Sequence, residues 1–175
     1  MMEGTENPNP ASPIGKGIKL LESITRQIPG FVPAYLLLAK GKLAIGNEFD
    51  ASMAVGKVLE MDSKNEEASI ILAMIRNKKK DYESALNSLQ EAIAINFKIR
   101  ENPLFMLIKG EIEYEMKNFQ ASEETMVQAI VLPSVKKRVH EDSNKKFRVL
   151  NFTEKDRCSI YLLLAKCYAK SNKQK

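Results

Sequence analysis

Apolar residues recur at spacings of three and four along most of the chain, which is the period of an amphipathic α-helix. Tyr35, Leu38 and Ala39, for example, fall on one face of a helix. No segment keeps the strict alternation of apolar and polar residues that predicts a half-buried strand. Short polar stretches, such as residues 79–81, separate the apolar ones. The pattern predicts helices at about residues 13–27, 32–45, 48–61, 65–78, 81–96, 102–117, 118–131 and 154–171.

Hydroxyl side chains mark where several of these helices begin. Ser12 is suited to cap a helix whose first residue is Pro13, because the proline ring already holds a helical φ. Ser63 and Thr153 each stand three residues before an acidic side chain, which is the spacing of a capping box. We therefore expect Ser12, Ser63 and Thr153 to lie at helix N-termini.

Two features of the sequence repeat along the chain. The letters Tyr-Leu-Leu-Leu-Ala-Lys at residues 35–40 recur without change at residues 161–166. A second pattern, an aromatic residue followed by small and large residues, begins at Tyr82 and again at Phe119 with identical spacing. Small residues between large ones let two helix backbones approach closely. The repetition predicts antiparallel helix hairpins that stack on one another, and hence an all-α fold.

The positions of these residues resemble the tetratricopeptide repeat (TPR), a helix–turn–helix unit of about 34 residues. Units begin at Val32, Glu66 and Pro103, and the segment after residue 153 repeats the first half of a unit. The resemblance implies a TPR-type α-solenoid of antiparallel helix hairpins, with about three full repeats and a half repeat at each end. Lys109 stands where the repeat has a large apolar residue, which leaves the register of that helix open.

This organisation divides the chain into four parts. A disordered N-terminus precedes the TPR array, which starts with the second helix of a preceding repeat. A basic, flexible insert then separates the array from the first helix of a further, incomplete repeat. The predicted bounds of the four parts are residues 1–12, 13–133, 134–153 and 154–175.

Three irregular stretches resemble a narrower family. Residues 97–109 read Phe-Lys-Ile-Arg-Glu-Asn-Pro-Leu-Phe-Met-Leu-Ile-Lys, Leu132 and Pro133 precede the basic insert, and residues 156–162 read Asp-Arg-Cys-Ser-Ile-Tyr-Leu. Their order and approximate spacing resemble the tetratricopeptide repeat protein 21 family, which supplies the large TPR subunit of intraflagellar transport complex A. Because members of that family are far longer, the resemblance also implies that this chain is a fragment or a truncated form.

The resemblance implies a non-catalytic scaffold that acts in retrograde ciliary transport and in ciliary cargo trafficking. It implies the other subunits of intraflagellar transport complex A as partners. It places the protein in the cytoplasm and at the cilium or flagellum and its base. A generic cytosolic TPR adaptor that binds peptides, or a basic helical-repeat module that binds RNA, are the alternatives.

Stacked helix hairpins leave a concave surface that is lined by the first helix of each pair. If the register of the family applies, this surface mixes apolar side chains with isolated charges, which suits a peptide. Packing between neighbouring repeats explains the same residues equally well. The predicted partner-binding residues are Leu36, Lys40, Leu43, Ile70, Met74, Asn77, Leu107, Glu111, Tyr114, Leu162 and Lys166.

The sequence shows no pattern for catalysis, a metal or a cofactor. His140 is the only histidine, and Cys158 and Cys167 are too few to form a zinc site without further ligands. Residues 15–17, Gly-Lys-Gly, lack the other glycines of a phosphate-binding loop. No apolar run approaches the ~20 residues that cross a bilayer. We therefore predict no enzyme activity, no cofactor, no small-molecule substrate and no membrane insertion.

The formal net charge of +5 is placed unevenly along the 175 residues. Residues 134–175 carry 12 basic and 4 acidic side chains, whereas residues 1–133 carry 15 basic and 18 acidic ones. A basic block of this kind attracts acidic protein faces or nucleic acid. RNA is the less favoured partner, because no set of base-reading residues recurs in each repeat and the insert holds only Phe147 for stacking.

Overall fold

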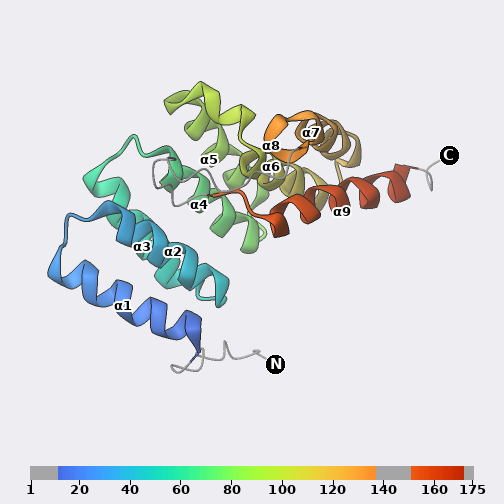
Figure 1. Ribbon diagram of the computed structural model, residues 1–175. Helices are drawn as coiled ribbons and strands as arrows, with labels where there is room; N and C mark the ends of the chain where they lie inside the picture. Colours follow the sequence, from blue (N-terminus) through green and yellow to red (C-terminus); the bar gives the residue numbers. More distant parts are fainter. Residues whose placement is uncertain (1–11, 137–150, 172–175) are drawn as a thin grey trace.

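The computed structural model describes residues 12–136 and 151–171, and over these residues the protein is helical (Figure 1). The all-α prediction is confirmed, and each predicted helix agrees with the structure to within two residues at either end. The sequence pattern did not predict two short helices, Phe97–Glu101 and Pro133–Lys136. The helices are α1 (Pro13–Gln27), α2 (Val32–Ala44), α3 (Glu48–Met61), α4 (Glu66–Lys78), α5 (Tyr82–Ile95), the 3₁₀-helix η1 (Phe97–Glu101), α6 (Pro103–Glu115), α7 (Phe119–Val131), α8 (Pro133–Lys136) and α9 (Glu154–Ser171).

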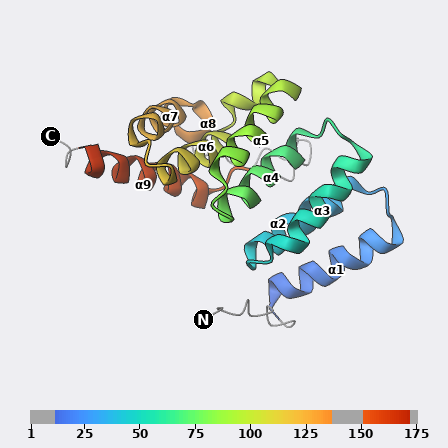
Figure 2. The same cartoon turned by 180° about the vertical axis from the view of Figure 1, so that it is seen from behind.

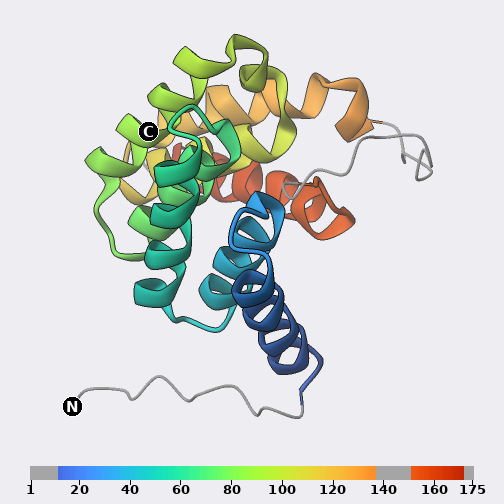
Figure 3. The ribbon, with the colours of Figure 1, turned by 90° about the vertical axis from the view of Figure 1, so that its left-hand side faces the viewer.

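The helices form three hairpins, α2–α3, α4–α5 and α6–α7, and each hairpin packs on the next. Helix α1 packs against α2, while α9 packs against both α7 and α6. Figures 1 and 2 show the hairpins following one another from α1 at one end to α9 at the other. Figure 3 views the array from the end where α1 lies, with the later helices behind it. The first helices also contact one another along the array, α2 with α4, α4 with α6 and α6 with α9. This arrangement is the predicted α-solenoid, and it places α2, α4, α6 and α9 along one side of the array.

Alanines make the close contacts within the hairpins. Ala39, Ala51, Ala73 and Ala85 are each 0% exposed, and they occupy the positions where the repeat has a small residue. Larger aliphatic side chains fill the space between helices, and burying each one stabilises the fold by about 1.5–3 kcal/mol. Among the larger residues that are almost completely enclosed are Ile70, Ile71, Ile75, Ile112, Met126 and Ile160.

Polar side chains cap the helices at the turns. The capping interactions predicted for Ser12 and Thr153 are confirmed, since the amides of Gly15 and Asp156 donate to their hydroxyls at 3.0 and 3.2 Å. The prediction for Ser63 is wrong. Asn65, two residues later, accepts from the amide of Ala68 at 2.9 Å, so the amide side chain next to the helix takes the capping position.

Each hairpin turns through a residue in the left-handed conformation. Gly46 has a φ of +76°, and Lys80 and Lys117 have φ values of 62° and 64°. The three positions are equivalent, because each follows the first helix of its hairpin. Only glycine adopts this conformation without a steric cost, so the two lysines carry a strain that the surrounding hairpin must offset.

The register of α6, left open by Lys109, is settled by a polar cluster between α6 and α7. The Nζ of Lys109 lies 3.1 Å from Oε1 of Glu113 and 3.2 Å from Oγ1 of Thr125. The Thr125 hydroxyl donates to Oε2 of Glu113 at 2.7 Å. Glu113 and Thr125 are both buried. Lys109 thus occupies an apolar position of the repeat with its side chain 41% exposed and its charge paired with the buried Glu113.

Helix α8 extends the ordered array beyond the predicted end at residue 133. Val135 is only 1% exposed, so the chain stays packed through a segment that was predicted to belong to the flexible insert. Residues 1–11 of the predicted disordered N-terminus and residues 137–150 of the predicted insert lie outside the described residues.

Gly110 is a point of close approach between α6 and its neighbours. A Cβ atom there would lie 2.5 Å from Cε of Met126 and 3.5 Å from Cδ2 of Leu163. Met126 is itself 0% exposed, so its methyl group has little room to move away. We predict that Gly110→Ala lowers the free energy of unfolding by about 1–3 kcal/mol, the usual cost of overpacking a core.

The matched control is Gly56→Ala, because a Cβ at Gly56 has no atom within 4 Å and the residue also lies inside a helix. That variant should gain about 0.5–1 kcal/mol, since alanine has the better helix propensity. Urea unfolding followed by circular dichroism measures both variants. Equal shifts in the two variants would contradict the close approach at Gly110.

Candidate partner-binding groove

Four of the eleven predicted partner-binding residues belong to the core. Leu36, Leu43, Ile70 and Leu107 are 3%, 8%, 2% and 4% exposed. Packing between repeats, the alternative that the sequence left open, accounts for these side chains. They pack beneath the surface of the array, and almost none of their side-chain surface is accessible to a partner.

Five of the other predicted residues line one groove of about 390 Å³ between α4, α6 and α9. They are Asn77 of α4, Glu111 and Tyr114 of α6, and Leu162 and Lys166 of α9. The last two, Lys40 and Met74, are partly buried and do not line the groove. The groove has the volume of a small-molecule pocket, but charged side chains surround it, which suits a short protein segment. The other lining residues are Lys78, Lys80, Tyr82, Glu115, Ser159 and Leu163.

Helical periodicity explains how α6 and α9 each present several residues to the groove. Glu111, Tyr114 and Glu115 are spaced at i, i+3 and i+4 on α6, so they share one face. On α9, Ser159 precedes Leu162 by three residues and therefore shares its face. The sequence prediction did not include Ser159. Lys80 had no such signal, because it lies in the turn between α4 and α5, outside any helical period.

Helix α9 forms one wall of the groove and is held in place by its packing on α6 and α7. Ile160, Leu163, Leu164 and Cys167 are buried, and α9 contacts α6 and α7. The Sγ of Cys167 lies 3.3 Å from the Ser122 hydroxyl of α7, and burial raises the pKa of this thiol. Cys167 is therefore a packing residue that stays in its thiol form.

Glu111 is the least solvated charge in the groove. Burial raises the pKa of its carboxyl group above the ordinary value, and Asp156 and Glu115 act in the same direction. Lys78 and Lys166 lower the pKa, but not enough to cancel the effect of burial. Within residues 12–136 and 151–171, no side chain forms a hydrogen bond or an ion pair with Glu111. The rim lysines, by contrast, are exposed: Lys78, Lys80 and Lys166.

The side of the array that holds the groove continues from α9 to α2. Burial lowers the pKa of Lys40 on α2, and Asp156 at the start of α9 and Glu67 on α4 partly offset this effect. Charges from two other helices, α4 and α9, therefore act on Lys40. Asp156, near the N-terminal end of α9, is thus near enough to the first hairpin for its charge to act on Lys40.

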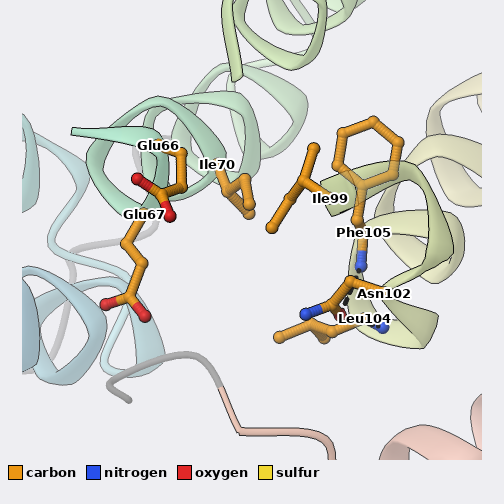
Figure 4. Close-up of a pocket in the computed structure, with 7 residues that line it drawn as sticks. All are labelled: Glu66, Glu67, Ile70, Ile99, Asn102, Leu104 and Phe105. Carbon is orange, nitrogen blue, oxygen red and sulfur yellow. Dashed lines mark hydrogen bonds between the residues drawn. The ribbon is translucent and has the colours of Figure 1, made fainter. Parts of the chain in front are cut away.

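A second hollow, between α4, η1 and α6, is far smaller (Figure 4). Its volume of about 10 Å³ leaves room for about one water molecule. Figure 4 shows Glu66, Glu67 and Ile70 on the α4 side, with Ile70 toward a mostly apolar wall from η1 and α6. This hollow is a packing gap and holds no candidate ligand site.

The described residues show no other site of chemistry. Among them, no three His, Cys, Asp or Glu side chains come together in a way that could hold a metal ion. None of the described helices combines the length and the apolar character that a membrane span requires.

Two sequence models of one protein family match the chain. The model for the tetratricopeptide repeat protein 21 second ARM domain matches residues 2–80. The model for the tetratricopeptide repeat protein 21 ARM repeat matches residues 97–175. Only the residues between these two matches and the first residue of the chain are left uncovered.

Curated relatives agree with these matches. Human tetratricopeptide repeat protein 21B is 28% identical over 162 residues, which cover 89% of this chain and 12% of that protein. The mouse protein of the same name is 30% identical over 169 residues, which cover 94% and 12%. Human tetratricopeptide repeat protein 21A is 23% identical over 154 residues, covering 87% and 11%. The chain thus spans about 12% of the length of the relatives that it matches.

Solved structures show the same fold. One crystal structure of MamA protein has a TM-score of 0.58 at 18% identity, covering 89% of this chain and 72% of that one. Another MamA crystal structure has a TM-score of 0.56 at 18% identity, covering 93% and 96%. At this level of identity the likeness extends to the arrangement of the helices alone.

The raised pKa of Glu111 predicts how stability depends on pH. The folded chain binds a proton at this site more tightly than the unfolded chain does, so the free energy of unfolding falls as pH rises from 4.5 through the folded-state pKa. Glu111→Gln removes this dependence. We therefore expect the variant to gain stability relative to the wild type as pH rises through that window.

Urea unfolding of both chains between pH 4 and pH 8 measures the difference. Glu124→Gln, which removes one charge from the exposed face of α7, is the matched control and should leave the pH profile of the wild type almost unchanged. Parallel pH profiles for wild type and Glu111→Gln would show that Glu111 is as well solvated in the folded chain as in the unfolded one.

Proposed function

Because the chain belongs to the tetratricopeptide repeat protein 21 family, we propose that it is a scaffold segment of intraflagellar transport complex A. In this role it contributes to retrograde ciliary transport and to ciliary cargo trafficking. Its partners are the other subunits of that complex. The protein acts in the cytoplasm and at the cilium or flagellum and its base.

The groove between α4, α6 and α9 is the observation that supports this proposal most directly. Three helices from successive repeats hold its side chains on a packed core, so a bound segment meets a surface that is already formed. A surface organised before binding loses little entropy when a partner docks. This is what a scaffold requires, since it forms and breaks no bond.

The proposal is tested by purifying the tagged chain from ciliated cells and identifying the co-purifying proteins by mass spectrometry. We expect complex A subunits to be enriched over a tag-only control. Their absence from a soluble, helical chain would contradict the proposal. Recovery of unrelated cytosolic proteins through the same groove would favour a generic TPR adaptor, and RNA bound with a steep salt dependence would favour the RNA-binding alternative.

The variant Leu162→Gln tests whether the partners bind in the groove. Leu162 is 58% exposed, so the change should leave the fold intact. Losing one buried apolar contact costs about 1.5–3 kcal/mol, and we therefore predict that recovery of complex A subunits falls roughly tenfold or more.

Val131→Gln is the matched control, because Val131 is 54% exposed but lies on α7, outside the groove. This variant should retain the partners. If both variants recover the subunits as well as the wild type does, the complex binds elsewhere on the chain.

A further inference from the structure

We propose that the groove selects a partner segment that inserts a lysine or arginine side chain toward Glu111. This inference rests on the proposed function only in so far as the groove is a protein-binding site. It adds the chemical class of the segment and names the residue that discriminates between segments.

The first argument is the state of Glu111. Glu111 is only partly exposed and burial raises the pKa of its carboxyl group, yet no described side chain bonds to it. A charge that is desolvated without a partner costs free energy, and that cost is recovered when a donor of opposite charge arrives. Lys78 and Lys166 act on Glu111 from a distance, but neither forms an ion pair with it. The position for a cation is therefore open in the free chain.

The second argument is the surface around Glu111. Tyr82, Tyr114 and Leu162 also line the groove, and their apolar surfaces suit the aliphatic stem of a lysine or arginine side chain. The ring of Tyr114 is held in place by an edge-to-face contact with Phe119, with 5.1 Å between the ring centroids. A fixed aromatic ring also attracts a cation that passes over its face.

The third argument is the charge at the rim, which restricts what else the segment contains. Lys78, Lys80 and Lys166 surround the groove and repel a segment that is basic throughout. We therefore expect the segment to carry acidic residues next to its lysine or arginine. The acidic residues then meet the rim lysines, and the lysine or arginine meets Glu111. A nucleic acid does not satisfy this pattern, because its phosphates would approach Glu111 and Glu115.

A library of random 12-residue peptides displayed on phage, selected on the full 175-residue chain, tests the inference. We expect the selected peptides to share one lysine or arginine at a fixed position, flanked by acidic residues. A selected peptide, synthesised and measured by fluorescence anisotropy, should bind Glu111→Gln at least tenfold more weakly than the wild type. Selected peptides without a shared basic residue, or no enrichment over a blank surface, would overturn the inference.

Glu124→Gln is the matched control, because Glu124 is an exposed acidic residue of α7 that lies outside the groove. It should change the affinity less than twofold. Replacing the shared basic residue of the peptide with norleucine tests the same contact without altering the protein, and should weaken binding as strongly as Glu111→Gln does. Equal binding of the norleucine peptide would overturn the inference even if Glu111→Gln failed to fold.

The two proposals fail in different ways. If the wild-type chain recovers complex A subunits from cells and Glu111→Gln recovers them equally well, the inference about Glu111 is wrong and the proposed function stands. If the peptides behave as expected but no complex A subunit is recovered, the groove binds a basic side chain in some other assembly.

Discussion

The seating of α9 on α6 and α7 is the contact on which the groove depends. Gly110 lets α6 approach Met126 and Leu163 because it carries no side chain. Nearby, the Ser122 hydroxyl donates to the backbone oxygen of Gly110 at 2.8 Å and also meets Cys167. One small residue therefore lets three helices meet. Without this meeting, Leu162 and Lys166 would not face α4, and α6 would present Glu111 to open solvent.

Much of the fold was predictable because each hairpin uses the same local chemistry. Helical periodicity, small residues at fixed positions and polar turns gave the helix bounds closely, and the segment that holds the second Tyr-Leu-Leu-Leu-Ala-Lys is helical in α9, as the first is in α2. The error at Ser63 arose where two capping side chains stand two residues apart. Sequence spacing does not decide between them, because the choice depends on which backbone geometry the preceding turn reaches.

The candidate site was predictable only in part, because periodicity gives the face of a helix but not its neighbours. Leu36 and Leu107 lie on the predicted face, yet both are buried. Leu162 occupies the equivalent place on α9 and is exposed. The distinction depends on how neighbouring helices pack, which the one-dimensional pattern does not contain. Lys80 is the opposite case, a groove residue that helical periodicity did not predict. It lies in a turn, and a turn residue lines the groove only once two hairpins are placed together.

The charged side chains of the groove differ in burial, and we therefore expect them to affect binding in different ways. Exposed lysines at the rim are screened by salt, so they affect mainly how fast an oppositely charged segment arrives. Glu111 lies deeper, where a paired charge affects how slowly the segment leaves. In the proposal above, the charge that discriminates between partners is thus the one that burial disfavours in the free chain. The packing that forms the groove also leaves the Glu111 side chain only partly exposed, so the same core that holds the helices together gives this carboxylate its place in recognition.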